Sequence, residues 1–264
     1  MSDPTSPTGS QSEAPRVALF VTCLVDLMRP SVGFAALRLL ERAGAKVAVP
    51  PGQTCCGQPA YNSGDLKDAR TIAKNVIETF EAFDHVVVPS GSCGGMIIKH
   101  YPEMFADDVA WTTRAEALAA RTQELTTYLA DHLDLNVPTS AFDGSATYHD
   151  SCAGLRELGV KSQPRKLLAT VDGLTLNEMD DVEACCGFGG LFSTKYPDIS
   201  GAIVDKKAAN VEAAETDLLL GGDLGCLMNV AGKLRRRGSE VRVFHIAEVL
   251  AGMTDGPAIG EDGA

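Results

Sequence analysis

The sequence predicts an α/β protein made of two similar tandem domains, each with a parallel sheet and with cysteine clusters at the carboxyl ends of its strands. The first observation is a repeat: each half carries a single cysteine, a Cys-Cys-Gly triplet and another single cysteine. These cysteines stand at positions 23, 55, 56 and 93 and again at 152, 185, 186 and 226, an offset of 129 to 133 residues. The second observation is that apolar runs alternate with helix-like segments, which is typical of parallel α/β units. Together they indicate an internal duplication.

The first half begins with a strand-like run that ends on Cys23 and continues with an amphipathic helix closed by Gly44. A short strand then leads to the Cys-Cys-Gly triplet. A helix, a buried strand and another helix that starts at Cys93 follow. We expect strands at 16–23, 46–50 and 85–93 and helices at 31–44 and 65–83.

The second half repeats this order. We expect strands at 145–152, 174–179 and 216–226, a helix at 198–215, a further helix from Cys226, and a closing strand and short helix within 241–253. The segment 112–133 reads as one helix without a clear counterpart in the second half. It carries Leu118, Leu125, Leu129 and Leu133 on one stripe, which predicts core packing or a bridge between the domains.

The composition sets the domain limits. The predicted domains are 15–140 and 141–252, because the segment 1–14 is rich in Ser, Pro and Thr and the segment 253–264 is rich in Gly and acidic residues. Both end segments are predicted to be disordered tails.

Ligands of parallel sheets bind beyond the carboxyl ends of the strands, so we expect the four cysteines of each half to gather at one sheet edge.

The charge and hydropathy exclude several classes of protein. A formal net charge of -12 argues against nucleic acid or an anionic membrane as the main partner. No apolar run approaches the roughly 20 residues that span a bilayer, and the first residues do not resemble a signal peptide. We therefore expect a cytoplasmic protein, in which eight reduced cysteines favour metal binding over disulfides.

The residue types at the repeated motif point to a thiolate-bound metal. Adjacent cysteines make a strained disulfide, but in a sharp turn followed by glycine both can face one object. Cys93 and Cys226 are predicted at helix N-termini, where a thiol pKa is lowered, and the loops SCGG and GFGG offer backbone N–H groups. Three interpretations remain open from the residues alone: iron–sulfur clusters, zinc at one site, or buried cysteines without metal.

The same motifs resemble a known family. The pattern is similar to the duplicated cysteine-rich CCG domain family, whose members include the CCG-bearing chain of heterodisulfide reductase and the iron–sulfur chains of glycolate oxidase and anaerobic glycerol-3-phosphate dehydrogenase. The resemblance covers residues 16–252. The segments SGSCGGMIIKHYPEMF, YHDSC, ACCGFGG and FHIAEVL resemble most the short, two-copy members that take part in lactate utilisation.

This resemblance implies an iron–sulfur redox subunit of a cytoplasmic complex that oxidises L-lactate to pyruvate. It implies two partner subunits, one of them ferredoxin-like, and a 4Fe-4S cluster in each half, while no catalytic residue is assigned. A heterodisulfide-reductase-like or glycolate-oxidase-like oxidoreductase subunit and a zinc-stabilised scaffold are the alternatives. The ligands that the resemblance implies are Cys23, Cys55, Cys56 and Cys93 for one site and Cys152, Cys185, Cys186 and Cys226 for the other.

The sequence departs from the family pattern where a fifth cysteine would stand. Met96 and Asn229 occupy these positions, so we expect Met96 to pack in its helix and Asn229 to lie at the surface or cap a turn. His149 comes three residues before Cys152 and could be read as a partner of a nucleophilic thiol. Because neighbours on a strand point to opposite faces, we expect His149 instead to lie beside the metal group or in the core.

Overall fold

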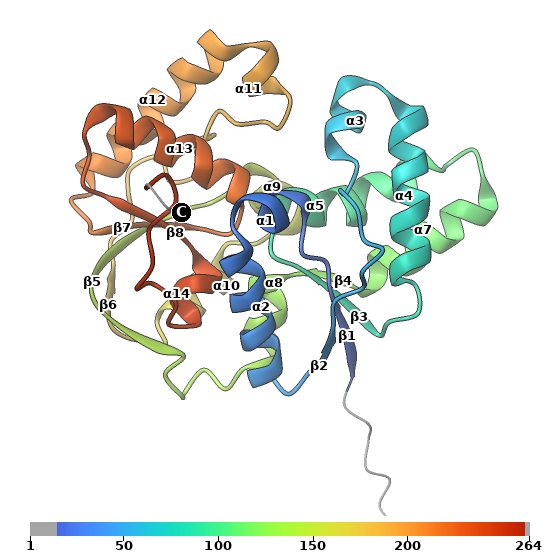
Figure 1. Ribbon diagram of the computed structural model, residues 1–264, viewed down its shortest axis with the longest axis horizontal. Helices are drawn as coiled ribbons and strands as arrows, with labels where there is room; N and C mark the ends of the chain where they lie inside the picture. The colour runs from blue at the N-terminus through green and yellow to red at the C-terminus, as the bar shows by residue number, and fades with distance from the viewer. Residues whose placement is uncertain (1–14, 262–264) are drawn as a thin grey trace, which may run out of the picture.

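Two parallel sheets with the same strand order form the framework of the chain in the computed structural model, which describes residues 15–261. The sheets have the orders β2-β1-β3-β4 and β6-β5-β7-β8 and lie side by side (Figure 1). The predicted fold class is therefore confirmed. The strands are β1 (Arg16–Leu19), β2 (Lys46–Ala48), β3 (His85–Val88), β4 (Thr122–Glu124), β5 (Ser140–His149), β6 (Val171–Leu176), β7 (Leu218–Gly221) and β8 (Arg242–His245).

Helices follow the strands in both halves, as the alternating pattern predicts. Those of the first half are α1 (Cys23–Met28), α2 (Pro30–Arg42), α3 (Gln58–Ser63), α4 (Leu66–Phe80), α5 (Gly91–Gly95), a π-helical segment (Met96–His100), α6 (Tyr101–Met104), α7 (Val109–Arg121) and α8 (Leu125–His132). Those of the second half are α9 (Cys152–Leu158), α10 (Ser162–Leu168), α11 (Phe192–Lys195), α12 (Pro197–Ala213), α13 (Leu224–Arg237) and α14 (Ile246–Leu250).

The single helix expected at 112–133 is wrong. The chain instead forms α7, the short strand β4 and α8, because residues 122–124 pair with β3 and so cover an edge that would otherwise be left open. The leucine stripe is divided accordingly. Leu118 packs in an apolar cluster of the first half, whereas Leu125 and Leu129 pack in a second cluster that also contains residues of the other half. In both halves the fourth strand leads into a short helix, so β4–α8 is the counterpart of β8–α14.

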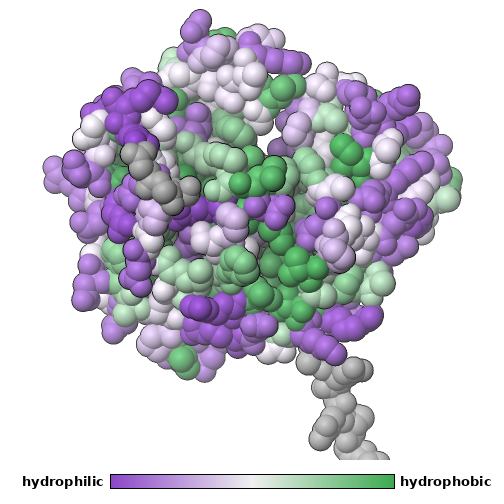
Figure 2. Space-filling model, viewed as in Figure 1, coloured by the Kyte–Doolittle hydropathy of each residue, from purple (hydrophilic) through white to green (hydrophobic). Residues whose placement is uncertain are grey.

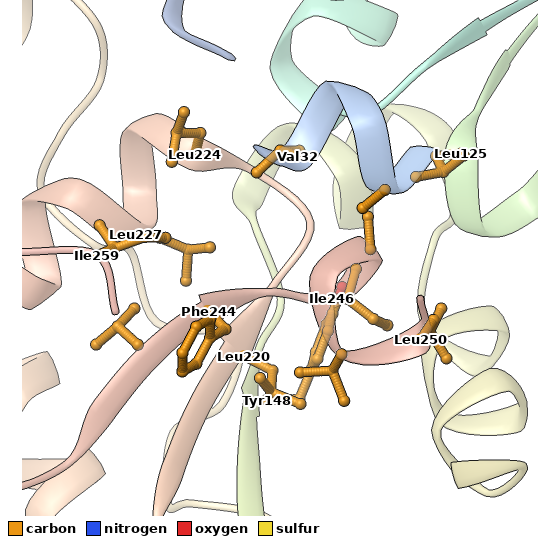
Figure 3. Close-up of a cluster of buried hydrophobic side chains, with 14 of the residues drawn as sticks. Val32, Leu125, Tyr148, Leu220, Leu224, Leu227, Phe244, Ile246, Leu250 and Ile259 are labelled. Carbon is orange, nitrogen blue, oxygen red and sulfur yellow. The ribbon is translucent and has the colours of Figure 1, made fainter. Parts of the chain in front are cut away.

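The two halves share a core. Val32 of α2 and Leu125 of α8 belong to the same apolar cluster as Tyr148 and Leu250 of the second half, and they lie on one side of that cluster in Figure 3. The buried ion pair between Arg29 Nε and Glu248 Oε1, at 2.9 Å, joins the same elements. This packing fixes the two sheets relative to each other, and the predicted boundary at 140/141 falls at the first residue of β5.

The structure differs from the prediction of a disordered tail from residue 253. Residues 253–261 return to the second sheet, where the Ile259 N–H donates to the Val243 oxygen at 2.9 Å. Ala258 and Ile259 are buried, and Figure 3 shows Ile259 near Leu227 and Phe244. Burial of these two apolar side chains outweighs the local composition. The predicted tail at 1–14 and the last residues, 262–264, lie outside the described residues.

Between residues 15 and 261, none of the helices has the length and apolar character needed to cross a lipid bilayer.

Candidate metal centres

Each set of four cysteines gathers at the carboxyl edge of its own sheet, as the sequence predicts. Cys23 is the first residue of α1 and Cys152 the first of α9, each directly after the first strand of its half. The Cys-Cys-Gly triplets follow β2 and β6, and the last cysteines, Cys93 and Cys226, lie in the helices that follow β3 and β7. All eight cysteines are free thiols. The arrangement follows from topology, because parallel strands end at the same edge.

The first set, Cys23, Cys55, Cys56 and Cys93, forms a chain of thiol contacts. The Cys55 thiol interacts with those of Cys23 and Cys56, and the Cys56 thiol interacts also with that of Cys93. Donation from Cys23 and Cys56 lowers the pKa of the Cys55 thiol to about 3. The same contacts, together with burial, raise the pKa of Cys23 and Cys56. Within this set, Cys55 is therefore the thiol whose pKa these contacts lower.

The second set, Cys152, Cys185, Cys186 and Cys226, repeats this pattern. Donation from the Cys152 and Cys186 thiols lowers the pKa of Cys185 to about 2, and Cys186 also contacts Cys226. The expected low pKa of Cys226 at a helix N-terminus is wrong. Its hydrogen bond with Cys186 does lower the pKa, but burial and the nearby charges of Asp223 and Cys185 outweigh this and raise it. In each adjacent pair, the first cysteine is the one whose pKa these contacts lower.

The glycine of each triplet explains why the two cysteines are adjacent. Gly57 and Gly187 both have φ of 83°, in the left-handed region that glycine adopts without strain. In this turn the glycine N–H faces the first cysteine of the pair, at 3.4 Å from Cys55 Sγ and 3.3 Å from Cys185 Sγ. Such donors stabilise a negatively charged sulfur ligand. The prediction that the GFGG loop offers an N–H group to the site is borne out at Gly187.

A side chain from the following helical region holds each turn in place. The Tyr101 hydroxyl donates to the Cys56 oxygen at 2.8 Å, and the Asn229 amide donates to the Cys186 oxygen at 2.9 Å. Asn229 therefore braces the turn, and Met96 is fully buried among apolar side chains of the first half, as its packing interpretation expects. The role of Tyr101 could not be predicted, because the sequence holds no local signal for it.

A cavity of about 250 Å³ lies between the halves beside the first set. All four cysteines of that set line it, and the opposite wall comes from the second half, with Phe188, Leu191, Asp223 and Leu224. A second hollow of about 310 Å³ touches Cys23 and Cys55 and is lined by Leu27 and Val49. The first set can thus be reached from two sides.

Exposed apolar side chains lie on α1 and α2 near this second hollow, whose wall also carries Asp26, Gln53 and Thr54. Leu27 is 76% exposed, and Met28 and Phe34 are exposed as well. Figure 2 shows apolar residues gathered on this face over α1 and α2. Exposed apolar side chains of this density are typical of a surface that contacts another protein.

The helices α5 and α9, which carry Cys93 and Cys152, pack against each other. A Cβ at Gly91 would lie 2.8 Å from the Gly154 Cα, so these helices pack with their backbones in contact. Asp223 of the second half reaches across, since its carboxylate accepts from the Ser92 N–H at 2.9 Å and from the Ser90 hydroxyl at 3.2 Å. The pKa of Cys152 is raised mainly by its hydrogen bond to Cys185 and by burial, and the charge of Asp223 adds to this. Asp223 therefore acts on both sets, a role that sequence reasoning missed.

His149 and Lys207 lie beside the second set. A ring nitrogen of His149 and the sulfurs of Cys186 and Cys226 all lie within 4.8 Å of one another. Burial, with the Lys207 charge second, lowers the pKa of His149 to about 3. The expectation that His149 lies beside the cysteine site is confirmed. Sequence reasoning missed Lys207, although a lysine on the buried stripe of the helix at 198–215 is a signal that could have identified it.

The donor atoms fit a thiolate-bound metal group. Each set offers four sulfur ligands, of which Cys185 is exposed and the others are partly or fully buried, with a backbone N–H aimed at one sulfur. Soft thiolate donors select iron–sulfur clusters, zinc or copper(I) over magnesium or calcium. Among residues 15–261, three donor atoms that all lie within 4.8 Å of one another occur in the second half, from His149, Cys186 and Cys226.

Comparison with known proteins agrees with the duplication. A model of the cysteine-rich CCG domain matches the chain twice, at residues 17–98 and 146–231. Lactate utilization protein A of Exiguobacterium sp. (strain ATCC BAA-1283 / AT1b) is 50% identical over 238 residues, which cover 89% of this chain and 97% of that protein. Lactate utilization protein A of Geobacillus kaustophilus (strain HTA426) is 50% identical over 235 residues, covering 89% and 98%. Lactate utilization protein A 2 of Bacillus cereus (strain Q1) is 46% identical over 236 residues, covering 89% and 98%.

Proposed function

Because the chain belongs to the cysteine-rich CCG domain family, we propose that it is an iron–sulfur redox subunit of a complex that oxidises L-lactate to pyruvate. The observation that carries the proposal is the pair of four-sulfur sets, each built on a glycine turn whose N–H faces a cysteine sulfur. The substrate in this proposal is inferred from similar proteins that carry the name Lactate utilization protein A.

The ligand sets favour iron–sulfur clusters over zinc. Structural zinc is usually held by pairs of cysteines two to four residues apart, a spacing that neither half contains. A cluster with four thiolates is anionic, and the Gly57 and Gly187 N–H groups favour such a charge. In this proposal Cys23, Cys55, Cys56 and Cys93 hold one cluster and Cys152, Cys185, Cys186 and Cys226 hold the other. A bound cluster accepts and releases single electrons.

The residues around the sets suggest a direction for the electrons. Oxidation of L-lactate to pyruvate releases two electrons and two protons, and the cluster-bearing sets pass the electrons on one at a time. We propose that electrons enter at the first set, which faces the cavity between the halves. They leave through the second set, where Cys185 is exposed. Two partner subunits, one of them ferredoxin-like, provide the donor and the acceptor.

The apolar surface over α1 and α2 supports a partner contact beside the first set. Leu27 lines the hollow that reaches Cys23 and Cys55 and is itself exposed. A partner that covers this surface would remove apolar area from water and exclude water from the cysteines at once. We place this assembly in the cytoplasm, where thiols remain reduced and able to bind metal.

Metal and sulfide analysis of protein purified without oxygen tests the proposal. We expect about eight iron and eight acid-labile sulfide per chain, which corresponds to a four-iron cluster with four cysteines in each half. Cys55→Ser and Cys185→Ser should each lose about half of both. About two zinc without sulfide would point to a structural scaffold and reject a redox role.

A growth experiment tests the substrate. In a strain that lacks the encoding gene and has no other lactate dehydrogenase, we expect no growth on L-lactate and normal growth on glucose. The wild-type chain should restore growth on lactate, and Cys55→Ser should not. If the deletion strain grows normally on lactate, the lactate assignment is rejected and the heterodisulfide-reductase-like or glycolate-oxidase-like alternative gains support.

A further inference from the structure

The duplicated halves differ where their cysteine sets meet the sheet. Phe20 stands three residues before Cys23, and His149 stands three residues before Cys152. Phe20 is fully buried and packs on Phe80, at 5.3 Å between ring centroids. The first half thus places an apolar ring at a position where the second half places an imidazole.

A second difference lies on the helix that follows each Cys-Cys-Gly turn. A Cβ at Gly57 would contact Ile72, and one at Gly187 would contact Ile203, so these two isoleucines correspond. Four residues further along each helix stand Val76 and Lys207. Val76 is fully buried in the apolar core of the first half. At these two positions the second half therefore carries a polar side chain where the first half carries an apolar one, and both polar side chains lie beside the second set.

The burial of His149 indicates that its imidazole contacts a bound group. It is 1% exposed, and neither ring nitrogen has a hydrogen-bond partner among residues 15–261. A buried polar group without a partner costs about 1–3 kcal/mol. One ring nitrogen lies together with the Cys186 and Cys226 sulfurs inside a 4.8 Å group. Histidine nitrogen and cysteine sulfur are both common metal ligands.

We propose that His149 is a fifth ligand, through a ring nitrogen and beside the four cysteines, of the metal group held by the second cysteine set, so that the two sets bind chemically different centres. The inference rests on the proposed function, since it concerns the group that the second set holds. It accounts for the unpartnered imidazole: its lone pair binds the metal, and the contact is absent from the first half because Phe20 has no donor atom.

Lys207 strengthens the difference between the sets. Its side chain is buried, and its ammonium is held by the Asp181 oxygen at 2.9 Å and the Val182 oxygen at 3.0 Å. It lies close enough to interact electrostatically with Cys185 and Cys186. A neutral imidazole ligand and a nearby positive charge both favour the reduced state of a cluster. The second centre is therefore the more easily reduced one, which agrees with electrons that move from the first set to the second.

The test is to detect the nitrogen directly. The complete protein, purified without oxygen from cells supplied with ¹⁵N-histidine, is reduced stepwise and examined by pulsed electron paramagnetic resonance. We expect a strong ¹⁵N coupling on the centre that is reduced first. His149→Phe, which installs the first-half residue, should abolish it. His245→Asn is the matched control, because His245 is also buried but caps α14 through the Ala247 N–H, and asparagine can cap too. This control should retain the coupling.

A second variant and a second measurement distinguish the loss of the nitrogen ligand from the loss of the bound metal. His149→Cys should keep iron and sulfide at the wild-type level while the ¹⁵N coupling disappears, even if His149→Phe binds no metal. If the bound metal is zinc, with one ion in each set, X-ray absorption at its edge should show about half a nitrogen neighbour per ion in the wild type and none in His149→Cys. Clusters without a strong ¹⁵N coupling, or with one that survives in His149→Cys, overturn the inference. Zinc without sulfide would reject the redox function, whereas the nitrogen count would still decide the role of His149.

Discussion

The glycine after each cysteine pair offers the sharpest test of how the sites are built. Gly57 and Gly187 share a φ of 83°, but their surroundings differ. A Cβ at Gly187 would lie 2.8 Å from the Ser200 backbone oxygen, whereas a Cβ at Gly57 would meet nothing closer than the Ile72 Cγ2 atom at 3.4 Å. The substitutions Gly57→Ala and Gly187→Ala therefore impose the same backbone strain and different steric strain.

The expected cost follows from these two terms. A non-glycine residue in the left-handed region costs about 1–2 kcal/mol, and this applies to both variants. Gly187→Ala adds a contact that only a backbone shift can relieve, at about 1–3 kcal/mol. With roughly 2–4 °C of Tm per kcal/mol for a chain of this size, Gly57→Ala should lower the Tm by roughly 2–8 °C. Gly187→Ala should lower it by roughly 4–20 °C.

The assay is thermal unfolding of the metal-loaded variants without oxygen, with iron measured on the same samples. A shift of the Gly187 backbone would move its N–H away from Cys185 Sγ, so Gly187→Ala should also lose iron from the second set. Gly57→Ala should keep most of its iron. An equal or larger loss of Tm in Gly57→Ala would refute the reasoning, because it would mean that the contact with Ser200 does not limit the turn.

Three further predictions concern buried charges. Arg29→Ala leaves the Glu248 carboxylate buried without its ion partner, so the free energy of unfolding should fall by about 3–5 kcal/mol in denaturant titration, and a loss below about 1 kcal/mol would contradict it. Burial raises the pKa of Glu124 to about 7 in the folded state, so the folded protein binds the proton more tightly, and the Tm should fall as pH rises from about 4.5 to 7. Glu124→Gln should flatten this slope, and an unchanged slope would assign it to other groups. Lys207→Met should lower the reduction potential of the second centre in a redox titration, whereas Lys206→Met should not, because Lys206 is 70% exposed.

The sequence by itself determined the repeat, the alternation of strands and helices and the edge at which the cysteines meet. These features follow from local signals, because the spacing of apolar residues along the chain distinguishes strands from helices, and parallel strands all end at one edge. The Cys-Cys-Gly turn could be predicted for the same reason, because only glycine adopts its φ without strain. The segment 112–133 and the tail from residue 253 could not, because β4 forms to cover the edge of β3 and Ile259 turns inward to meet Val243.

Only the tertiary structure decided what surrounds each set of cysteines. Asp223 reaches the first set from the second half, and Lys207 reaches the second set from a helix more than twenty positions beyond Cys185. His149 could be placed near a metal group from its sequence position, but its two unpartnered nitrogens are visible only once β5, the second Cys-Cys-Gly turn and α13 are packed together. The physical reason is that burial and electrostatic contact depend on segments that are distant in the chain, and the local sequence pattern does not encode their approach.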